Sequence, residues 1–414
     1  MSTLAIEGGT PVRTRPFPPR APFGLADAQQ VLEALDQQTL FFPGGRKVYE
    51  FQKQFGALYG VNHVVCSTSG TSAIHVAVGA IDPEPGDEII TTPISDMGTV
   101  APIILQAAIP VFADVDPTTG ILDPDDVERK ITERTKAIIV VHCWGQAADM
   151  DRFVAIARRH HLYLIEDCAQ SHLTRYKGRL TGTIGDLGTF SLQDSKHLQC
   201  GDGGITITND DHLGARAALF VDKGCNWSED RTVRLRYAFI APCYRMTELQ
   251  GAVLLAQLPR LPEIVARRQA LGERLRQSLL GLPGITPPGR IEGAEHSYWS
   301  FPILIDEKVL GVTAPEFGKA AQAEGAPIGG NWLGKPLYLF EALAEQITFG
   351  RSRFPFRSPY AHQPVQYGPG LCPRAEQMMA QLRTISLNER YTEEDIDDIA
   401  RAVRKVAEEY ARRC

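Results

Sequence analysis

The chain has 414 residues, of which 43% are apolar and 22% are charged, a composition typical of a soluble globular protein with a sizeable core. Its net charge of −6 and pI near 6.0 offer no basic face for nucleic acid, and no polybasic run suggests a membrane surface. The amino terminus lacks a signal-peptide pattern, and no apolar run approaches the length of a membrane span. We therefore expect a cytoplasmic protein that binds neither nucleic acid nor membrane.

The first part of the chain alternates helix-like and strand-like segments. After an N-terminal arm (residues 1–25), amphipathic stretches such as 26–38, 70–81 and 150–161 are interleaved with short apolar runs, among them "HVVCS", "DEIITT", "IPVFADV", "KAIIVVHC" and "LYLIED". This alternation predicts βαβ units that build a mainly parallel sheet with helices on both faces. We expect a large α/β domain over residues 26–261, with its ligand beyond the carboxyl ends of the strands.

The composition changes after one long helix-like stretch, "YRMTELQGAVLLAQLPRLPEIVARRQALGERLRQSLLGL". The turn-rich "PGITPPGR" follows, and then strand-like "YWSFPILID", a helix, a loop rich in Gly, Pro and aromatic residues, and the charged helix "TEEDIDDIARAVRKVAEEYARR". We interpret residues 262–414 as a smaller α+β domain. The loop over residues 329–370 is long for a compact domain, and such loops are often lids or binding loops.

The cysteine and histidine pattern does not predict a metal site. Eight cysteines are scattered without a C-x-x-C pair or a His/Cys ligand spacing, so we expect free and mostly buried thiols. The "RRHH" run at residues 158–161 fits a cationic helix C-terminus better than a ligand set, because adjacent residues of a helix point apart.

The stretch "FSLQDSKHLQCGDGG" carries the strongest functional signal. Lys196 follows a β-prone run and precedes a glycine cluster, so the chain holds one amine in a tight turn. Asp167 ends the apolar run "LYLIED", where a buried carboxylate needs a partner, although an N-cap or an ion pair would also explain it. In "STSGTSAIHVAV", Thr71 and Ser72 begin a helix, which suits a phosphate but is also a common structural cap. Ser191 lies five residues before the lysine.

An amine, a buried carboxylate and a phosphate cup are the requirements of pyridoxal phosphate. A lysine holds its aldehyde as a Schiff base, a carboxylate keeps its ring nitrogen protonated, and hydroxyl and N–H groups anchor its phosphate. The residues therefore predict an enzyme that uses this cofactor.

The order of motifs resembles the DegT/DnrJ/EryC1/StrS aminotransferase family, the sugar and cyclitol aminotransferases among the fold type I pyridoxal-phosphate enzymes. The resemblance covers nearly the whole chain and rests on "SGTSAIHVAV", "GDEIITTP", "IPVFADVDPTTG", "EDCAQSH", "GTIGDLGTFSLQDSKHLQCGDGG", "YRMTELQGAVLLAQL" and "CPRAEQ". It implies that Lys196 bonds the cofactor and then moves the proton, and that Asp167 pairs with the ring nitrogen. It places Gln170 over the ring, assigns phosphate contacts to Thr71, Ser72 and Ser191, and implies a homodimer.

Five positions depart from the pattern of this family. Met97 stands where an aromatic residue usually stacks on the cofactor ring, and a thioether covers a ring less rigidly. Cys243 replaces an asparagine that reaches the phosphate of the neighbouring subunit. Leu173 and Thr174 replace Gly-Ala after "EDCAQSH", which would reshape the substrate space. Asp202 replaces a glutamate, which is a mild change.

The resemblance implies transfer of an amino group from glutamine or glutamate to a ketosugar or keto-cyclitol. An elimination or dehydration on the same cofactor is the alternative reaction, although Lys196 argues against the dehydratase branch, which has histidine at that position. A non-catalytic regulator is a further alternative, but no appended basic module or helix-turn-helix signal is present. The aromatic-rich loop with Asn331, Trp332 and Tyr338 suggests a hydroxyl-rich acceptor, although these residues could equally be packing residues.

Overall fold

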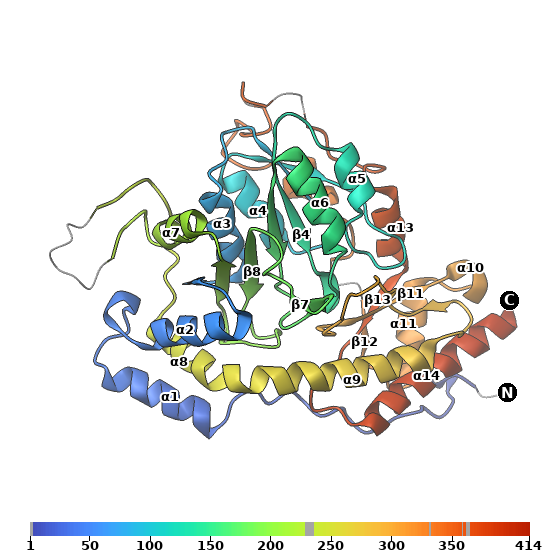
Figure 1. Ribbon diagram of the computed structural model, residues 1–414. Coiled ribbons are helices and arrows are strands. Elements are labelled where there is room, and N and C mark those ends of the chain that lie inside the picture. Colours follow the sequence, from blue (N-terminus) through green and yellow to red (C-terminus); the bar gives the residue numbers. More distant parts are fainter. Residues whose placement is uncertain (1–2, 228–235, 331–332, 358, 362–364) are drawn as a thin grey trace.

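A computed structural model describes residues 3–227, 236–330, 333–357, 359–361 and 365–414. Within these ranges the chain builds two main sheets, of seven and four strands, joined by a long helix, α9 (Leu261–Leu279), which runs along one edge of the molecule (Figure 1). No helix of the described ranges is long and apolar enough to cross a membrane.

The larger sheet has seven strands in the order β1-β9-β8-β5-β4-β2-β3. The pairs from β8 to β3 are parallel, whereas β9 pairs antiparallel with both β1 and β8. The predicted α/β class with a mainly parallel sheet is therefore confirmed. The strands are β1 His63–Ser67, β2 Glu88–Thr91, β3 Ile109–Phe112, β4 Thr135–Val141, β5 Tyr163–Asp167, β8 Leu187–Ser191 and β9 Gly204–Thr208.

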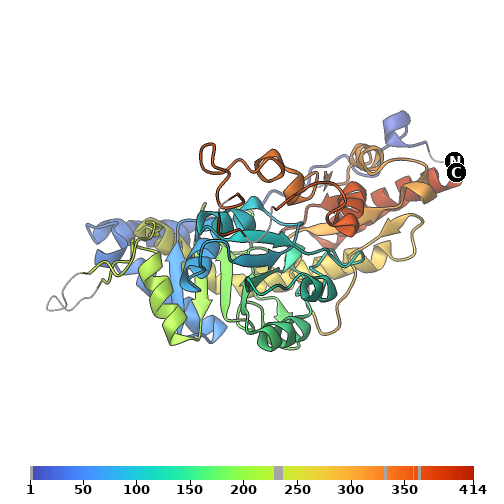
Figure 2. The same cartoon turned by 90° about the horizontal axis from the view of Figure 1, so that it is seen from above.

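Helices cover both faces of this sheet, as Figure 2 shows from above. Neighbouring strand residues such as Ile138 and Ile139 are both fully buried but belong to different hydrophobic clusters, as expected for a sheet with two covered faces. One face packs against α3 (Gly70–Ala80) and α7 (Asp211–Phe220). The other face packs against α6 (Met150–His160) at one end, and against α2 (Lys47–Tyr59) and α8 (Glu248–Gln257) at the other. The remaining helices of this part are α1 Leu25–Asp36, α4 Met97–Leu105 and α5 Pro124–Arg129.

The smaller sheet is antiparallel and has its own apolar core. Its order is β10-β11-β13-β12, and α9, α11 and α14 pack on it with Leu4 of the N-terminal arm. Its elements are β10 Ile285–Thr286, β11 Phe301–Ile305, α10 Glu307–Leu310, α11 Ala314–Ala323, β12 Ile328–Gly329, β13 Leu382–Ile385 and α14 Glu393–Arg413. A short hairpin joins β6 Arg175–Tyr176 to β7 Arg179–Leu180.

The predicted single helix before the second sheet is in fact three elements. A 3-10 turn (Leu258–Arg260) separates α8 from α9. Pro259 and Pro262 lack the N–H groups that a continuous helix needs, and each falls at the start of a new helical segment.

The domain boundary near residue 261 remains a prediction, and it coincides with the start of α9. The later chain nevertheless returns to the first core. Leu337, Leu343 and Met378 pack in the hydrophobic cluster that contains β4 and α6, together with α12 (Glu341–Ala344) and α13 (Pro373–Gln381). The predicted long loop therefore includes short helical pieces that cover the larger sheet.

Candidate active site

A cavity of about 400 Å³ opens at the carboxyl edge of the larger sheet. It lies where β5 and β8 end and where α3 and α4 begin, as expected for a ligand site of a parallel sheet. Five of the residues predicted from sequence line it: Thr71, Asp167, Gln170, Ser191 and Lys196. The fold thus brings together groups that are as many as 125 positions apart in the chain, from residue 71 to residue 196.

The Lys196 amine lies in this cavity, 4.0 Å from the centre of the Trp299 ring. The lysine is partly exposed because the cavity is open, but the surrounding protein desolvates its amine. This desolvation lowers the pKa of Lys196 to about 8, and the negative charges of Asp167 and Asp96 oppose the shift. A solvated surface lysine would not show this shift, so a substantial neutral fraction near pH 8 is a property of the site.

The Asp167 carboxylate ends β5 and is almost completely buried. Burial raises its pKa, while the Ala169 N–H, the Thr99 hydroxyl and the positive charge of Lys196 counteract part of that shift. Thr99 Oγ1 donates to Oδ2 at 2.9 Å, and the Ala169 N–H donates to Oδ1 at 3.0 Å. The carboxylate is therefore held by one hydrogen bond on each oxygen and still faces the cavity.

The first turn of α3 forms the opposite wall. Ser69 caps the helix by accepting the Ser72 N–H at 3.0 Å, and the Ser72 hydroxyl accepts the Ser69 N–H at 2.8 Å. This reciprocal cap leaves the first amides of the helix, at Gly70 and Thr71, at the open end beside the cavity. Gly70 lets this turn approach β8 closely, because a Cβ at that position would lie 2.7 Å from Ser191 Cβ.

Gln170 is fixed by the backbone of a neighbouring segment. The Trp144 N–H donates to Gln170 Oε1 at 2.6 Å, so the NH₂ end of the amide is the end that can donate to a ligand. Trp144 has a positive φ of 56° inside a short 3-10 turn, Cys143–Gly145, and this turn directs its N–H toward Gln170.

Two predicted cofactor contacts are absent from the cavity lining. The Ser72 hydroxyl is engaged in the helix cap, and Met97 is half-buried at the first position of α4, where it packs against the large hydrophobic cluster of the sheet. Contact of either residue with a cofactor stays a prediction.

Leu173 and Thr174 lie behind the site rather than in its substrate space, which corrects the expectation for these two positions. Leu173 packs in the apolar cluster under β8, and Thr174 is fully buried and donates to Ser297 Oγ at 2.8 Å. Leu173 adopts a φ of 54°, a backbone conformation that favours glycine.

Cys243 and Arg245 precede α8 in the chain. Cys243 is exposed, and Arg245 forms an ion pair with Asp222 and lies over the Phe41 ring, with 5.1 Å to its centroid. The structure thus provides Arg245 with a carboxylate partner within the same chain.

Tyr338 is a packing residue. It is fully buried, and its hydroxyl is hydrogen-bonded to Glu376, so it is not available to an acceptor. Asn331 and Trp332, the other predicted acceptor contacts, lie outside the described residues.

Sequence reasoning missed Trp299, Asp96 and Thr99, all of which line the cavity. Trp299 arrives from just before β11 and donates its indole N–H to the Ser195 carbonyl at 3.1 Å. It is 103 positions after Lys196, and no local pattern marks it. Thr99 was detectable in principle, since it lies in the first turn of the helix that follows β2.

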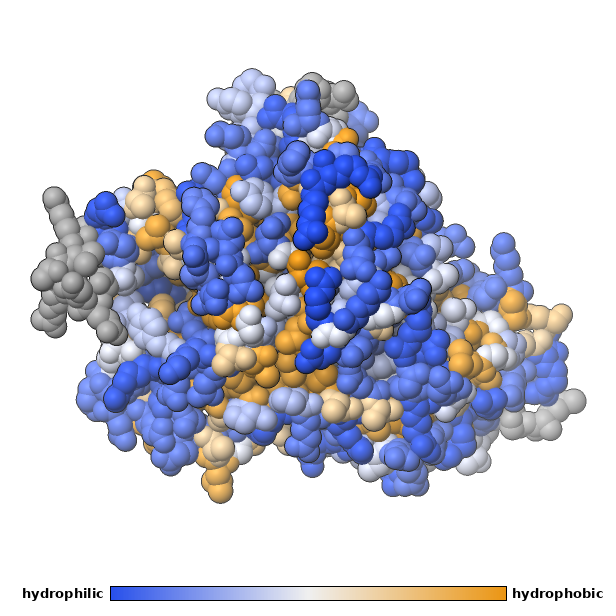
Figure 3. Space-filling model, viewed as in Figure 1, coloured by the Kyte–Doolittle hydropathy of each residue, from blue (hydrophilic) through white to orange (hydrophobic). Residues whose placement is uncertain are grey.

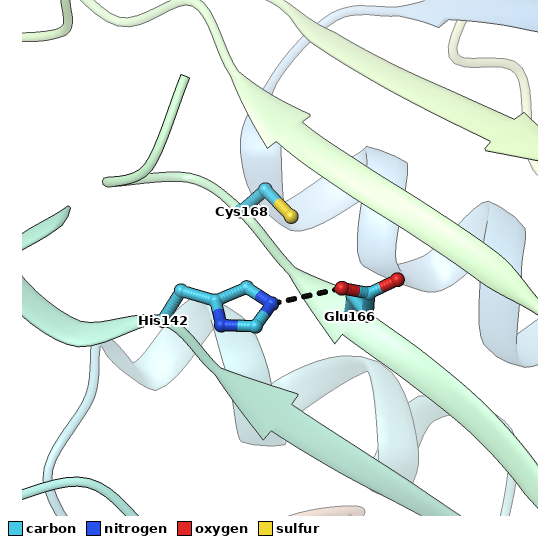
Figure 4. A group of neighbouring side chains, drawn as sticks. All are labelled: His142, Glu166 and Cys168. Carbon is cyan, nitrogen blue, oxygen red and sulfur yellow. Dashed lines mark hydrogen bonds and ion pairs between the residues drawn. The ribbon is translucent and has the colours of Figure 1, made fainter. Parts of the chain in front are cut away.

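His142, Glu166 and Cys168 form a buried cluster next to Asp167 (Figure 4). Their ligand atoms lie within 4.8 Å of one another, which resembles a metal site. However, Glu166 accepts the N–H groups of Ile184 and Gly185 at 2.7 Å each, and His142 Nε2 lies 3.0 Å from its other oxygen. His142 Nδ1 accepts the Ala148 N–H, so the ring donates from Nε2. Because Glu166 and His142 already have these hydrogen-bond partners, we interpret the cluster as a structural support for the end of β5.

A mainly parallel sheet with a lysine, a buried carboxylate and a helix N-terminus at its carboxyl edge defines a fold type I α/β aminotransferase. The sequence pattern of the DegT/DnrJ/EryC1/StrS aminotransferase family matches residues 24–328. The chain belongs to this family and is an aminotransferase, which confirms the family predicted from its motifs.

Individual relatives extend the similarity over almost the full length. The chain is 34% identical to the L-glutamine:2-deoxy-scyllo-inosose aminotransferase of Streptoalloteichus tenebrarius over 97% of each chain. It is 37% identical to the GDP-perosamine synthase of Caulobacter vibrioides over 67% of this chain and 74% of that protein. An aminotransferase from Psychrobacter cryohalolentis has a similar structure, with a TM-score of 0.84, 25% identity and coverage of 95% and 100% of the two chains.

Proposed function

We propose that the protein is a pyridoxal-phosphate-dependent aminotransferase that transfers an amino group from glutamine or glutamate to a keto-cyclitol or ketosugar. The observation that carries the proposal is the placement of the Lys196 amine and the Asp167 carboxylate in one cavity, with the first turn of α3 as its third wall. When bound, the cofactor supplies an aldehyde that bonds amines and a ring that withdraws electrons from the bonded carbon.

The residues present fit this cofactor. The Lys196 amine would hold the aldehyde carbon, and Asp167 would hold the protonated ring nitrogen. The free amides of the first turn of α3, with the hydroxyls of Thr71 and Ser191, would hold the phosphate. The close approach of α3 to β8 at Gly70 leaves little space for a larger residue there, so the anion cup depends on that glycine.

The side chains of the site have separate tasks. Lys196, once released by an incoming amine, is the base that moves a proton, and its lowered pKa keeps part of it neutral near pH 8. Asp167 would pair with the ring nitrogen, and the Thr99 hydroxyl and the Ala169 N–H hold its two oxygens in place for that contact. The Gln170 NH₂ group would donate to the ring oxygen, since its amide oxygen is already occupied by Trp144.

The donor and acceptor classes are supported by the relatives. A protein 34% identical over nearly the full length carries the name of a glutamine-dependent aminotransferase that acts on a keto-cyclitol, and another carries the name of a GDP-linked aminosugar synthase. Polar side chains line part of the cavity, among them Asp96, Gln193, Ser195 and Asp202, and these groups suit an acceptor rich in hydroxyls.

The test combines cofactor mapping with a donor screen. Borohydride reduction of the cofactor-saturated protein should place the adduct on the Lys196 peptide. In a separate, unreduced sample, glutamine or glutamate should yield pyridoxamine phosphate, and 2-deoxy-scyllo-inosose or a nucleotide-linked ketosugar should return it to pyridoxal phosphate. Label on another lysine would overturn the site assignment. Release of ammonia or water from a substrate without pyridoxamine phosphate would replace transamination with elimination.

A homodimer completes the proposal. Phe23, Leu25, Leu32 and Leu35 expose large apolar side chains on and just before α1, and Figure 3 shows hydrophobic side chains at the lower edge of the molecule over this helix. A second copy of the chain is the expected partner for this surface.

A further inference from the structure

Two loops meet at the Lys196 amine, and neither is a regular element. The first is residues 193–199, between β8 and β9, and the second is residues 296–300, before β11. They touch at three points: Lys196 lies over the Trp299 ring, the Trp299 indole donates to the Ser195 carbonyl, and His197 Nε2 lies 3.0 Å from the Ser297 carbonyl. The position of the amine therefore depends on how firmly both loops are held.

Both loops are held from behind by arginines. Arg20, on the N-terminal arm, donates to the carbonyls of Asp194 at 2.8 Å and His197 at 3.3 Å. Arg268, buried on α9, donates to the Trp299 carbonyl at 3.4 Å. Each arginine thus contacts the backbone of one loop, and the two come from segments almost 250 positions apart in the sequence.

A single carboxylate joins these arginines. Glu389 Oε1 accepts from Arg20 Nε at 2.9 Å, and Oε2 accepts from Arg268 Nε at 3.0 Å and Nη2 at 2.9 Å. Its side chain is only 15% exposed. Burial alone would raise the pKa of Glu389, but the positive charges of Arg268 and Arg20 lower it. The carboxylate therefore stays ionised and keeps both guanidinium groups oriented toward the loops.

We infer that Glu389 is a positioning residue for the reaction, which sets the contact between Lys196 and Trp299 by holding Arg20 on one loop and Arg268 on the other. Glu389 lies behind the loops and does not line the cavity, so its effect reaches the amine through the two arginines. Small displacements of a reacting group strongly reduce rates, which gives this link a kinetic consequence. The inference rests on the proposed function insofar as Lys196 is the reacting amine.

Hydrogen exchange of the full chain, read by mass spectrometry, measures the link directly. In Glu389→Gln, the protection factors of the amides of 193–199 and 296–300 should fall roughly tenfold, while those of β4 and α6 stay unchanged. Two single substitutions should separate the contribution of Arg20 from that of Arg268. Arg20→Lys should loosen 193–199 selectively, and Arg268→Lys should loosen 296–300, because lysine cannot reproduce the fork of hydrogen bonds.

Glu263→Gln is the matched control. Glu263 lines the same surface cavity as Glu389 and Arg20, and it is exposed. This change should leave exchange and kcat unaltered. In Glu389→Gln, kcat should fall about tenfold with the donor KM nearly unchanged, and Glu389→Asp should recover part of the loss.

Equal acceleration of exchange over the whole chain in Glu389→Gln would reduce the residue to a stability role and overturn the inference. If that variant does not fold, the Arg20→Lys variant decides, since Arg20 lies on the arm; unchanged exchange over 193–199 would then overturn it. Failure of the borohydride mapping at Lys196 would remove the proposed function, yet the exchange pattern would still report whether Glu389 holds the loops.

Discussion

The Lys196 amine and the Asp167 carboxylate share one cavity, and each opposes the shift that its surroundings impose on the pKa of the other. Desolvation favours the neutral form of both groups, and their mutual attraction favours the charged forms. The pKa of each group is thus set by two opposing causes, desolvation by the surrounding protein and attraction to the charge of the other group.

Removal of the Asp167 charge should lower the pKa of Lys196 further. In Asp167→Asn the desolvation of the amine remains and the opposing negative charge is lost, so the titration midpoint should fall below about 8. The measurement is the pH dependence of Lys196 labelling by an amine-reactive reagent in cofactor-free protein, followed by peptide mapping. Asp202→Asn, a change at another lining residue, is the control. A midpoint near 10.5 in the unchanged protein would contradict the description of the site.

The same lowered pKa predicts a pH dependence of stability. Between pH 8 and 10.5 the unfolded chain binds a proton at Lys196 that the folded chain has lost, so the free energy of unfolding should rise with pH across this window. The gain is at most roughly 3.5 kcal/mol, because the pKa values of the unfolded and folded chain differ by about 2.5 and one pKa unit corresponds to about 1.4 kcal/mol. Denaturant unfolding of the unchanged protein and of Lys196→Met, both free of cofactor, isolates the effect. Parallel pH profiles for the two proteins would exclude it.

The buried cluster of His142, Glu166 and Cys168 next to Asp167 should contribute substantially to the free energy of unfolding. Glu166→Ala leaves the Ile184 and Gly185 amides and the His142 ring without their acceptor, and should cost about 3 kcal/mol. His142→Ala removes one donor from Glu166 and the acceptor of the Ala148 amide, so its cost should be smaller. Chemical denaturation gives both values. If His142→Ala cost as much free energy of unfolding as Glu166→Ala, or more, then His142 and not Glu166 would be the main stabilising residue of the cluster.

The fold and the central residues of the site could be predicted from the sequence because both depend on patterns of neighbouring residues along the chain. Alternating apolar runs and helices predict the sheet, and a lysine and an aspartate placed just after strands meet at its carboxyl edge. Trp299 and Glu389 could not be found in this way, because both come from distant segments and meet the site by tertiary packing alone. Trp299 contacts the Lys196 loop directly, whereas Glu389 is linked to that loop through Arg20. Leu173 and Tyr338 mislead for a related reason: a pattern cannot distinguish a wall of the cavity from the core immediately behind it.

The homodimer prediction concerns the exposed apolar side chains of α1. Replacement of Leu25 and Leu32 together by Asp places charges in the centre of this surface and should shift the protein toward monomers, as light scattering would show. Leu105→Asp, at another exposed leucine on α4, should not change the assembly. A monomeric unchanged protein with full activity at low concentration would refute the dimer.

Met97 provides the last prediction, because sequence and structure suggest two different roles for it. The family resemblance predicts that it covers the cofactor ring, whereas the structure packs it against the hydrophobic cluster and outside the cavity lining. If it covers the ring, Met97→Ala should weaken retention of pyridoxal phosphate and shift the absorbance of the bound cofactor, and Met97→Leu, which keeps the volume, should retain much of the binding. If it is a packing residue, Met97→Ala should lower the free energy of unfolding by about 2 kcal/mol and leave the spectrum unchanged. Dialysis followed by absorbance spectroscopy, with denaturation of the same samples, separates the two roles.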